Sequence, residues 1–125
     1  MNYDIHMDVK YAPLDIVDAA KLADECKEQW WNQSLCKVND SVVRLGVFLG
    51  EFHFHKHDRE DELFFVLEGR LLVDFEEAEG RSPRTVELGP RQGVVVPQGV
   101  VHRTRAAERT VVLMVEAATV IPTGD

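Results

Sequence analysis

The sequence is short of cysteine, of basic residues and of long apolar runs. Its 125 residues include two cysteines, Cys26 and Cys36, too few for a disulfide framework. Lysine and arginine total 14 against 22 aspartates and glutamates, which gives a formal net charge of −8. An acidic surface repels phosphate backbones and anionic membranes, so we expect no nucleic-acid partner. No apolar run approaches the roughly 20 residues of a membrane helix, so we expect no membrane partner.

Targeting and nucleotide-binding signatures are also missing. Residues 1–4 lack the basic-then-apolar layout of a secretory signal peptide, so we expect a cytoplasmic protein. The sequence has no glycine-rich phosphate loop and no nucleophile elbow, and neither cysteine has the spacing of a redox or zinc motif. The length and the 45% hydrophobic content fit one domain with its own core, which we place at 1–125.

One segment has the pattern of a helix. Apolar residues recur at spacings of three and four from Ile16 to Trp30, which stacks them on one helix face. Asp15 is a suitable N-cap, so we predict a helix over about 15–31. A short strand at 9–11 is expected before it, and this N-terminal part spans about 9–32.

From residue 34 onward the pattern is that of strands separated by turns. An extended stretch runs from 41 to 57, with a bend near Gly50. Short strands with hairpin loops predict an all-β fold, an antiparallel sandwich or barrel, over about 34–117. The further predicted strands are 63–67, 70–76, 85–88, 94–96 and 110–115.

Three histidines alternate along the extended stretch, at His53, His55 and His57. Alternate strand residues point to the same face, about 6.6 Å apart, so the imidazoles of His55 and His57 can converge on one point. A transition metal is the usual reason to aim two imidazoles at one point. Glu62 follows after a turn-length gap and can open the adjacent strand beside the histidines. His102 comes from a separate hairpin, after a proline–glycine turn.

This pattern resembles the cupin superfamily. The first cupin motif, two histidines one residue apart followed by a glutamate and a glycine, reads His55, His57, Glu62 and Gly69 here. The second motif, proline, any residue, glycine, two residues and histidine, is matched by residues 97–102. The matched region runs from about 50 to 115. The resemblance implies a double-stranded antiparallel β-helix, or jelly-roll barrel, with one N-terminal α-helix.

By this resemblance, His55, His57, Glu62 and His102 bind one divalent transition metal inside the barrel. Three neutral imidazoles and one carboxylate suit Fe, Mn, Co, Ni, Cu or Zn, and the sequence does not choose among them. An octahedral metal would leave two positions for water and substrate. Four ligands could instead close a tetrahedral zinc site with a structural role. The alternative is a cupin that holds no metal.

Other residues are candidates for the surroundings of this site. His53 is expected in a pocket or proton-transfer role, with direct ligation of the metal as the alternative, and Glu51 is the other candidate for moving a proton. Phe64 shares the parity of Glu62, so it is a candidate pocket residue, with plain core packing as the alternative. Arg44 and Arg105 are candidates for meeting an anionic substrate, with surface solvation as the alternative.

Three functional hypotheses follow. The first is a metalloenzyme that acts on a small oxygen-rich organic molecule, with dioxygenase, isomerase or lyase chemistry. The second is a barrel that binds a small ligand or a metal without turnover. The third is a scaffold or storage barrel, which would leave the histidine pair without a use. The family resemblance also implies a homodimer.

Overall fold

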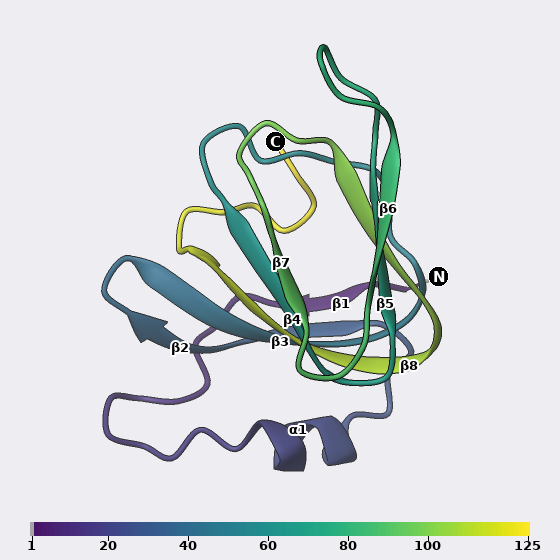
Figure 1. The fold of residues 1–125 in the computed structure, drawn as a ribbon. Helices are drawn as coiled ribbons and strands as arrows, with labels where there is room; N and C mark the ends of the chain where they lie inside the picture. The colour runs from purple at the N-terminus through teal and green to yellow at the C-terminus, as the bar shows by residue number, and fades with distance from the viewer. Residues whose placement is uncertain (1) are drawn as a thin grey trace.

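The computed structural model describes residues 2–125 as a β structure with one short helix (Figure 1). The helix has seven residues, and no helix in the described part of the chain is long and apolar enough to cross a membrane. In chain order the elements are β1 (Asp4–His6), α1 (Ala19–Glu25), β2 (Trp31–Val38), β3 (Ser41–Glu51), β4 (Glu62–Glu68), β5 (Leu71–Phe75), β6 (Arg84–Leu88), β7 (Gly93–Val96) and β8 (His102–Ala117).

Strand β8 organises the sheet. On one edge it pairs antiparallel with β3, from Ala117 opposite Ser41 to Arg105 opposite Glu51. On its other edge it pairs first with β5 and then with β4. The remaining strands extend the sheet outward from these pairs. Strand β2 pairs with β3, β7 with β4 and β6 with β5, and β1 pairs with β2 in parallel. The expected all-β jelly-roll fold with one N-terminal helix is confirmed.

Strand β8 bends back on itself. A straight strand of its 16 residues would span about 50 Å. Yet Glu62 lies beside His102 at the start of β8 and pairs in register with Glu116 near its end. The partner changes from β5 to β4 between Arg105 and Val111, and the pairing with β3 shifts register there. Figure 1 shows β8 turning at the base of the barrel, above α1, so both of its ends run back toward the opposite end of the barrel.

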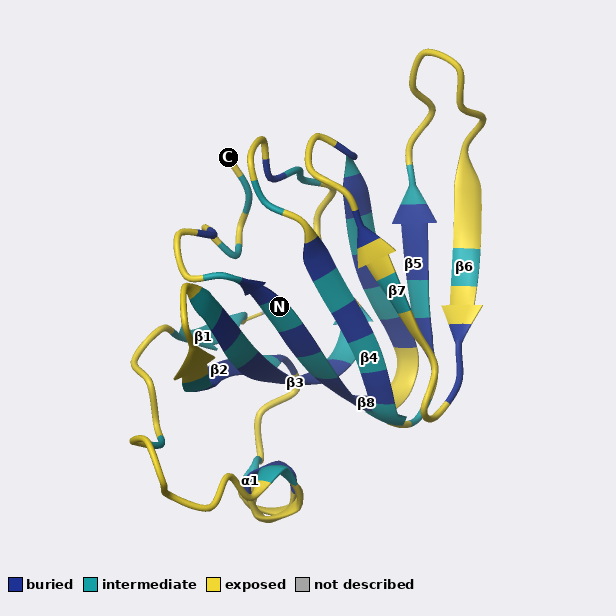
Figure 2. Cartoon of the chain, turned by 60° about the vertical axis from the view of Figure 1, so that its left-hand side comes forward, coloured by how far each residue is buried: buried dark blue, intermediate teal, exposed yellow. Residues whose placement is uncertain are grey.

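The core fills the space between the two arms of β8. Trp30 stacks on Phe48 with ring centroids 4.2 Å apart and on Phe52 at 5.4 Å, while Tyr3 meets it edge-on. Figure 2 shows buried and less buried residues alternating along β4 and much of β8, as expected for strands with one face on the core. A smaller apolar cluster packs α1, through Leu22 and other residues, against the opposite face of β2 and β3.

The predicted helix over 15–31 is wrong at both ends. Helix α1 starts after Asp18, whose carboxylate accepts a hydrogen bond from the Lys21 N–H at 3.0 Å. Asp15, the predicted N-cap, instead accepts from the Ala12 N–H in the preceding turn. Ile16 was expected on the apolar helix face, but it precedes the helix and is 86% exposed.

The C-terminal half of the predicted helix is not helical and joins the barrel instead. Cys26 is extended, with φ −71° and ψ 123°, so the helix stops at Glu25. Trp30 then enters the core and Trp31 opens β2, earlier than the predicted barrel start at 34. Burial of a tryptophan ring in the barrel outweighs the modest preference of this segment for helix.

Two predicted strands also differ. The N-terminal strand is β1 at 4–6 rather than 9–11, although residues 10 and 11 donate backbone hydrogen bonds to β2 carbonyls. The stretch predicted over 41–57 ends as a strand at Glu51, and the expected bend appears at Gly50, where φ is 107°. The histidine segment beyond it is irregular, joined to β8 by one bridge between His55 and His102.

Gly69 is required where the β4–β5 turn meets the bend of β8. Its φ is +88°, and a Cβ would lie 2.5 Å from Thr110 Oγ1 and 2.8 Å from the Arg109 carbonyl oxygen. We predict that Gly69→Ala lowers the free energy of unfolding by about 3 kcal/mol, from backbone strain and overpacking together. Gly80→Ala is the matched control, because φ there is +73° with nothing within 4 Å. Urea unfolding followed by circular dichroism measures both, and equal losses would contradict the packing argument.

Candidate metal centre

Three short segments bring four side chains together at one end of the barrel. His55 and His57 lie between β3 and β4, Glu62 opens β4, and His102 opens β8. Their ligand atoms all lie within 4.8 Å of one another. His57, Glu62 and His102 are buried, and His55 is half-buried. The cluster therefore combines the four side chains that the sequence motifs singled out.

The atoms that face one another in this cluster have no hydrogen-bond partner among the described residues. Oε1 of Glu62 lies 3.3 Å from Nε2 of His57 and 3.4 Å from Nε2 of His102, yet none of the three makes a hydrogen bond. Polar atoms buried without a partner are costly. A cation held between them removes that cost, so the donor set fits a metal ion.

Backbone carbonyls set the tautomers of two of the histidines. Nδ1 of His55 lies 2.9 Å from the carbonyl oxygen of His53, and Nδ1 of His102 lies 2.9 Å from that of Val100. A carbonyl oxygen only accepts, so each Nδ1 carries the proton and each Nε2 keeps its lone pair. Reciprocal backbone hydrogen bonds between His55 and His102 hold the two rings side by side.

The charge states suit a divalent cation. Burial is the main reason that the pKa of His55 is lowered to about 4, and the neighbouring imidazoles of His102 and His57 act in the same direction. Burial raises the pKa of Glu62, but the facing nitrogens of His102 and His57 outweigh it and hold that pKa well below its usual range. Neutral imidazole at His55 and an ionised carboxylate at Glu62 are the forms that bind transition metals.

A buried polar network lies behind Glu62, and sequence reasoning found only one member of it. Glu116 pairs with Glu62 across β4 and β8, and burial beside Glu62 raises its pKa to about 10. Arg44 is fully buried, with Nη1 3.5 Å from Glu116 Oε1 and Nε donating to Asn32 Oδ1 at 2.8 Å. Arg44 was a candidate for meeting substrate, but its side chain is engaged inside the barrel. Glu116 was missed, although its parity with the inward-facing Met114 was a usable signal.

A narrow cavity of about 30 Å³ touches this centre. His55, Glu62 and Phe64 line it together with several core aromatics, and the ring of Phe64 lies 6.0 Å from that of His102. The cavity has room for about two water molecules. Phe64 therefore faces inward, where the sequence parity placed it, but the space beside it is smaller than an organic substrate.

The C-terminal segment covers the loop that carries two of the histidines. The His53 Nε2–H donates to the Thr123 carbonyl at 2.8 Å, and the Asp125 N–H donates to the Lys56 carbonyl at 2.9 Å. Gly124 approaches so closely that a Cβ there would lie 2.6 Å from the Cβ of His55. In Figure 1 this yellow segment crosses the same end of the barrel as the histidine loop. It restricts access to the cluster from that side.

The two candidate proton carriers lie outside the cluster. His53 is exposed, and its ring lies 5.3 Å from that of His55. The Glu51 side chain is 63% exposed, with its carboxylate 3.4 Å from Nη1 of Arg103. His53 is thus a neighbour of the cluster, whereas Glu51 belongs to the outer face of the sheet.

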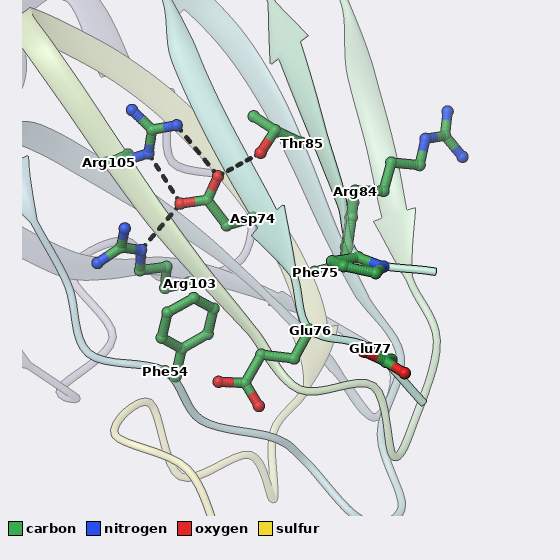
Figure 3. A pocket seen from close by; sticks show the side chains of 10 residues that line it. Phe54, Asp74, Phe75, Glu76, Glu77, Arg84, Thr85, Arg103 and Arg105 are labelled. Atoms are coloured by element: carbon green, nitrogen blue, oxygen red, sulfur yellow. Dashed lines mark hydrogen bonds and ion pairs between the residues drawn. The ribbon is translucent and has the colours of Figure 1, made fainter. Parts of the chain in front are cut away.

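Arg105 also lies on the outer face, in a groove of about 560 Å³ (Figure 3). Asp74 accepts hydrogen bonds from the Nε atoms of Arg103 and Arg105, both at 2.8 Å, and from Thr85 Oγ1 at 2.7 Å. Residues of β8 alternate in direction, so Arg103 and Arg105 point out while His102 points in. The structure therefore does not bring Arg105 to the histidine cluster.

The Asp74 network makes a pH-dependent contribution to stability. Bonds from Arg105, which outweigh the effect of burial, hold the pKa of Asp74 well below its usual range. This contribution is complete above the pKa of an unfolded aspartate, about 3.9, and is lost progressively as the pH falls below it. We predict that Asp74→Asn lowers the free energy of unfolding by about 2 kcal/mol at pH 7 and by less at pH 3.

Urea unfolding of metal-free protein at both pH values tests this prediction. Glu87→Gln is the matched control, because Glu87 forms a largely exposed pair with Arg70 at 3.8 Å on the same face of the sheet. Such pairs contribute about 0–1 kcal/mol, so we expect little change. An Asp74→Asn loss that is equal at pH 3 and pH 7 would contradict the assignment.

Comparison with known proteins places the chain in a family. The family model for the cupin domain matches residues 49–117. The uncharacterized protein YdbB of Bacillus subtilis (strain 168) is 48% identical over 95 residues, which cover 76% of this chain and 80% of YdbB.

Solved structures share the fold. A cupin-2 domain containing protein from Shewanella frigidimarina NCIMB 400 is 25% identical, covers 82% of this chain and 94% of its own, and superposes with a TM-score of 0.73. Hydroquinone 1,2-dioxygenase from Sphingomonas sp. TTNP3 also gives a TM-score of 0.73, at 18% identity, over 90% of this chain and 36% of the dioxygenase. The second likeness concerns the fold alone. With the family match over more than half of the chain, these findings show that the protein belongs to the cupin family.

Proposed function

We propose that the protein binds one divalent transition metal through His55, His57, Glu62 and His102. The observation that carries this proposal is the convergence of unpartnered, buried donor atoms on one point. Hydrogen bonds from Nδ1 of His55 and His102 to backbone carbonyls orient the rings before any metal arrives. Fe, Mn, Co, Ni, Cu and Zn all suit this donor set.

We further propose that the metal centre is catalytic and acts on a small oxygen-rich organic molecule. When bound, the metal would supply Lewis-acid or redox chemistry of dioxygenase, isomerase or lyase type. The core aromatics and Phe64 keep bulk water away from the inner side of the cluster. His53 is our candidate for moving a proton, because its exposed ring lies next to that of His55 and its Nε2 contacts the Thr123 carbonyl oxygen. The outward position of Glu51 gives it no comparable role.

A barrel that binds a metal or small ligand without turnover is the second candidate. The size of the inner cavity favours it, since about 30 Å³ leaves no room for an organic substrate beside the cluster. The C-terminal segment narrows the approach further. A substrate would therefore bind only after this segment has moved, whereas a metal or a water-sized ligand fits the structure as it stands.

Metal uptake is the first test. Protein purified without added metal is analysed for metal content, then stripped with a chelator and titrated with Mn²⁺, Co²⁺, Ni²⁺ and Zn²⁺ in a competition assay. We predict one equivalent per chain, and at least about 100-fold weaker binding in His57→Ala and Glu62→Gln, since loss of a neighbour that only supports a ligand already costs 10–100-fold. His6→Ala is the control, because His6 lies away from the cluster in β1. Failure of the stripped wild type to bind any of these metals would refute the proposal.

Turnover separates the two candidates. The metal-loaded protein is incubated with a panel of small carboxylates, sugars and catechols, and both substrate loss and oxygen uptake are followed. Consumption that disappears in His57→Ala supports the enzyme. Saturable binding without consumption supports the ligand-binding barrel. A cytoplasmic location and a homodimer stay predictions from the sequence.

A further inference from the structure

A charged network inside the barrel has no evident use in building the core. Arg44 and Glu116 are both buried, on β3 and β8, and they face each other with Nη1 and Oε1 3.5 Å apart. Asn32 of β2 binds the other side of the guanidinium. Most of the barrel interior around them is built from apolar side chains.

Such a network is an expensive way to stabilise a fold. Desolvation of buried charges often exceeds their mutual attraction, and apolar replacements of similar volume are often neutral or stabilising. Here two buried atoms of the network, Arg44 Nη2 and Glu116 Oε2, also have no hydrogen-bond partner among the described residues. The network therefore needs a reason other than stability.

Its position next to Glu62 supplies that reason. Glu62 and Glu116 are direct partners in the β4–β8 register, and both side chains are buried. Directly opposed strand residues have Cβ atoms about 5 Å apart. Two buried carboxylates so close do not both ionise, in agreement with the raised pKa of Glu116 and the lowered pKa of Glu62. Arg44 reaches the same interior from β3, where its Nη1 lies 3.5 Å from Glu116 Oε1 and its charge attracts the Glu62 carboxylate. One cation thus constrains the pair from behind, while Oε1 of Glu62 faces His57 and His102.

We propose that Arg44 and Glu116 are positioning residues that hold the Glu62 carboxylate in the orientation needed to bind the metal. This inference rests on the proposed metal site, and it adds two residues that are not themselves ligands. Supporting residues behind a ligand fix its orientation, and their loss weakens metal binding without removing a donor atom.

The test replaces the pair by apolar residues of similar volume. Arg44→Met/Glu116→Leu removes the guanidinium and the carboxyl group together, so neither is left inside the barrel without the other. We expect metal-free protein to unfold at the same urea concentration as wild type or higher. We expect Co²⁺ and Mn²⁺ to bind 10–100-fold more weakly, by chelator competition. The visible absorption bands of bound Co²⁺ should shift as well, because they report ligand geometry rather than stability.

Two further variants complete the design. Arg44→Lys keeps the charge but loses the planar fork that spans Asn32 and Glu116. We expect it to fold and to bind Co²⁺ about 10-fold more weakly, which provides a test even if the double variant fails to fold. Met114→Leu is the matched control, an inward-facing residue of β8 with no donor to Glu62, and its Co²⁺ affinity and spectrum should equal those of wild type.

The outcomes separate this inference from the proposed function. Wild-type protein that binds no metal refutes the metal site and this inference with it. Wild type that binds metal, with folded Arg44→Lys and double variants of unchanged affinity and Co²⁺ spectrum, refutes only the positioning role. Weaker binding and shifted bands in variants that retain wild-type stability support it.

Discussion

The site depends on the bend of β8. Because this strand turns back on itself, its first residue and its penultimate one both lie beside Glu62, which opens β4. A straight strand would separate His102 and Glu116 by most of the length of the molecule. The bend in turn relies on the register shifts in β3 and β4 and on close packing of Gly69 against Thr110. Backbone geometry at the base of the barrel thus sets the side-chain geometry at its mouth.

Each side of the cluster is held by a different kind of contact. The rings of His55 and His102 are fixed from behind by backbone carbonyls, which cannot be lost by substitution of a side chain. Neither ring nitrogen of His57 has a hydrogen-bond partner among the described residues. The carboxylate of Glu62 has only side chains behind it, Glu116 and through it Arg44. Unlike His55 and His102, Glu62 therefore depends on other side chains for its orientation. This asymmetry explains why a charged network persists next to Glu62, in an otherwise apolar interior.

The features that depend on local sequence patterns could be predicted from the sequence. The strand alternation, the bend at Gly50 and the two motifs around His55 and His102 are all short-range signals, and the structure brings the motif residues together. The helix failed because its apolar face included Trp30, which packs against aromatic residues more than 15 positions away in sequence. The directions of Arg44 and Arg105, like the role of Glu116, depend on which strands become neighbours. No local pattern contains that information.

Strand β8 carries two networks of polar and charged side chains, and their contrast bears on function. The outer one joins Asp74 to Arg103 and Arg105 at a partly exposed surface, where desolvation is modest and every oxygen of Asp74 is satisfied. It stabilises the pairing of β5 with β8. The inner one, Arg44 with Glu116, is fully desolvated and leaves buried atoms without partners. A fold that needed only stability would keep the first network and fill the place of the second with apolar side chains. The inner network is better explained by its position next to Glu62. The residues that serve the metal centre would then extend from the mouth of the barrel into its core.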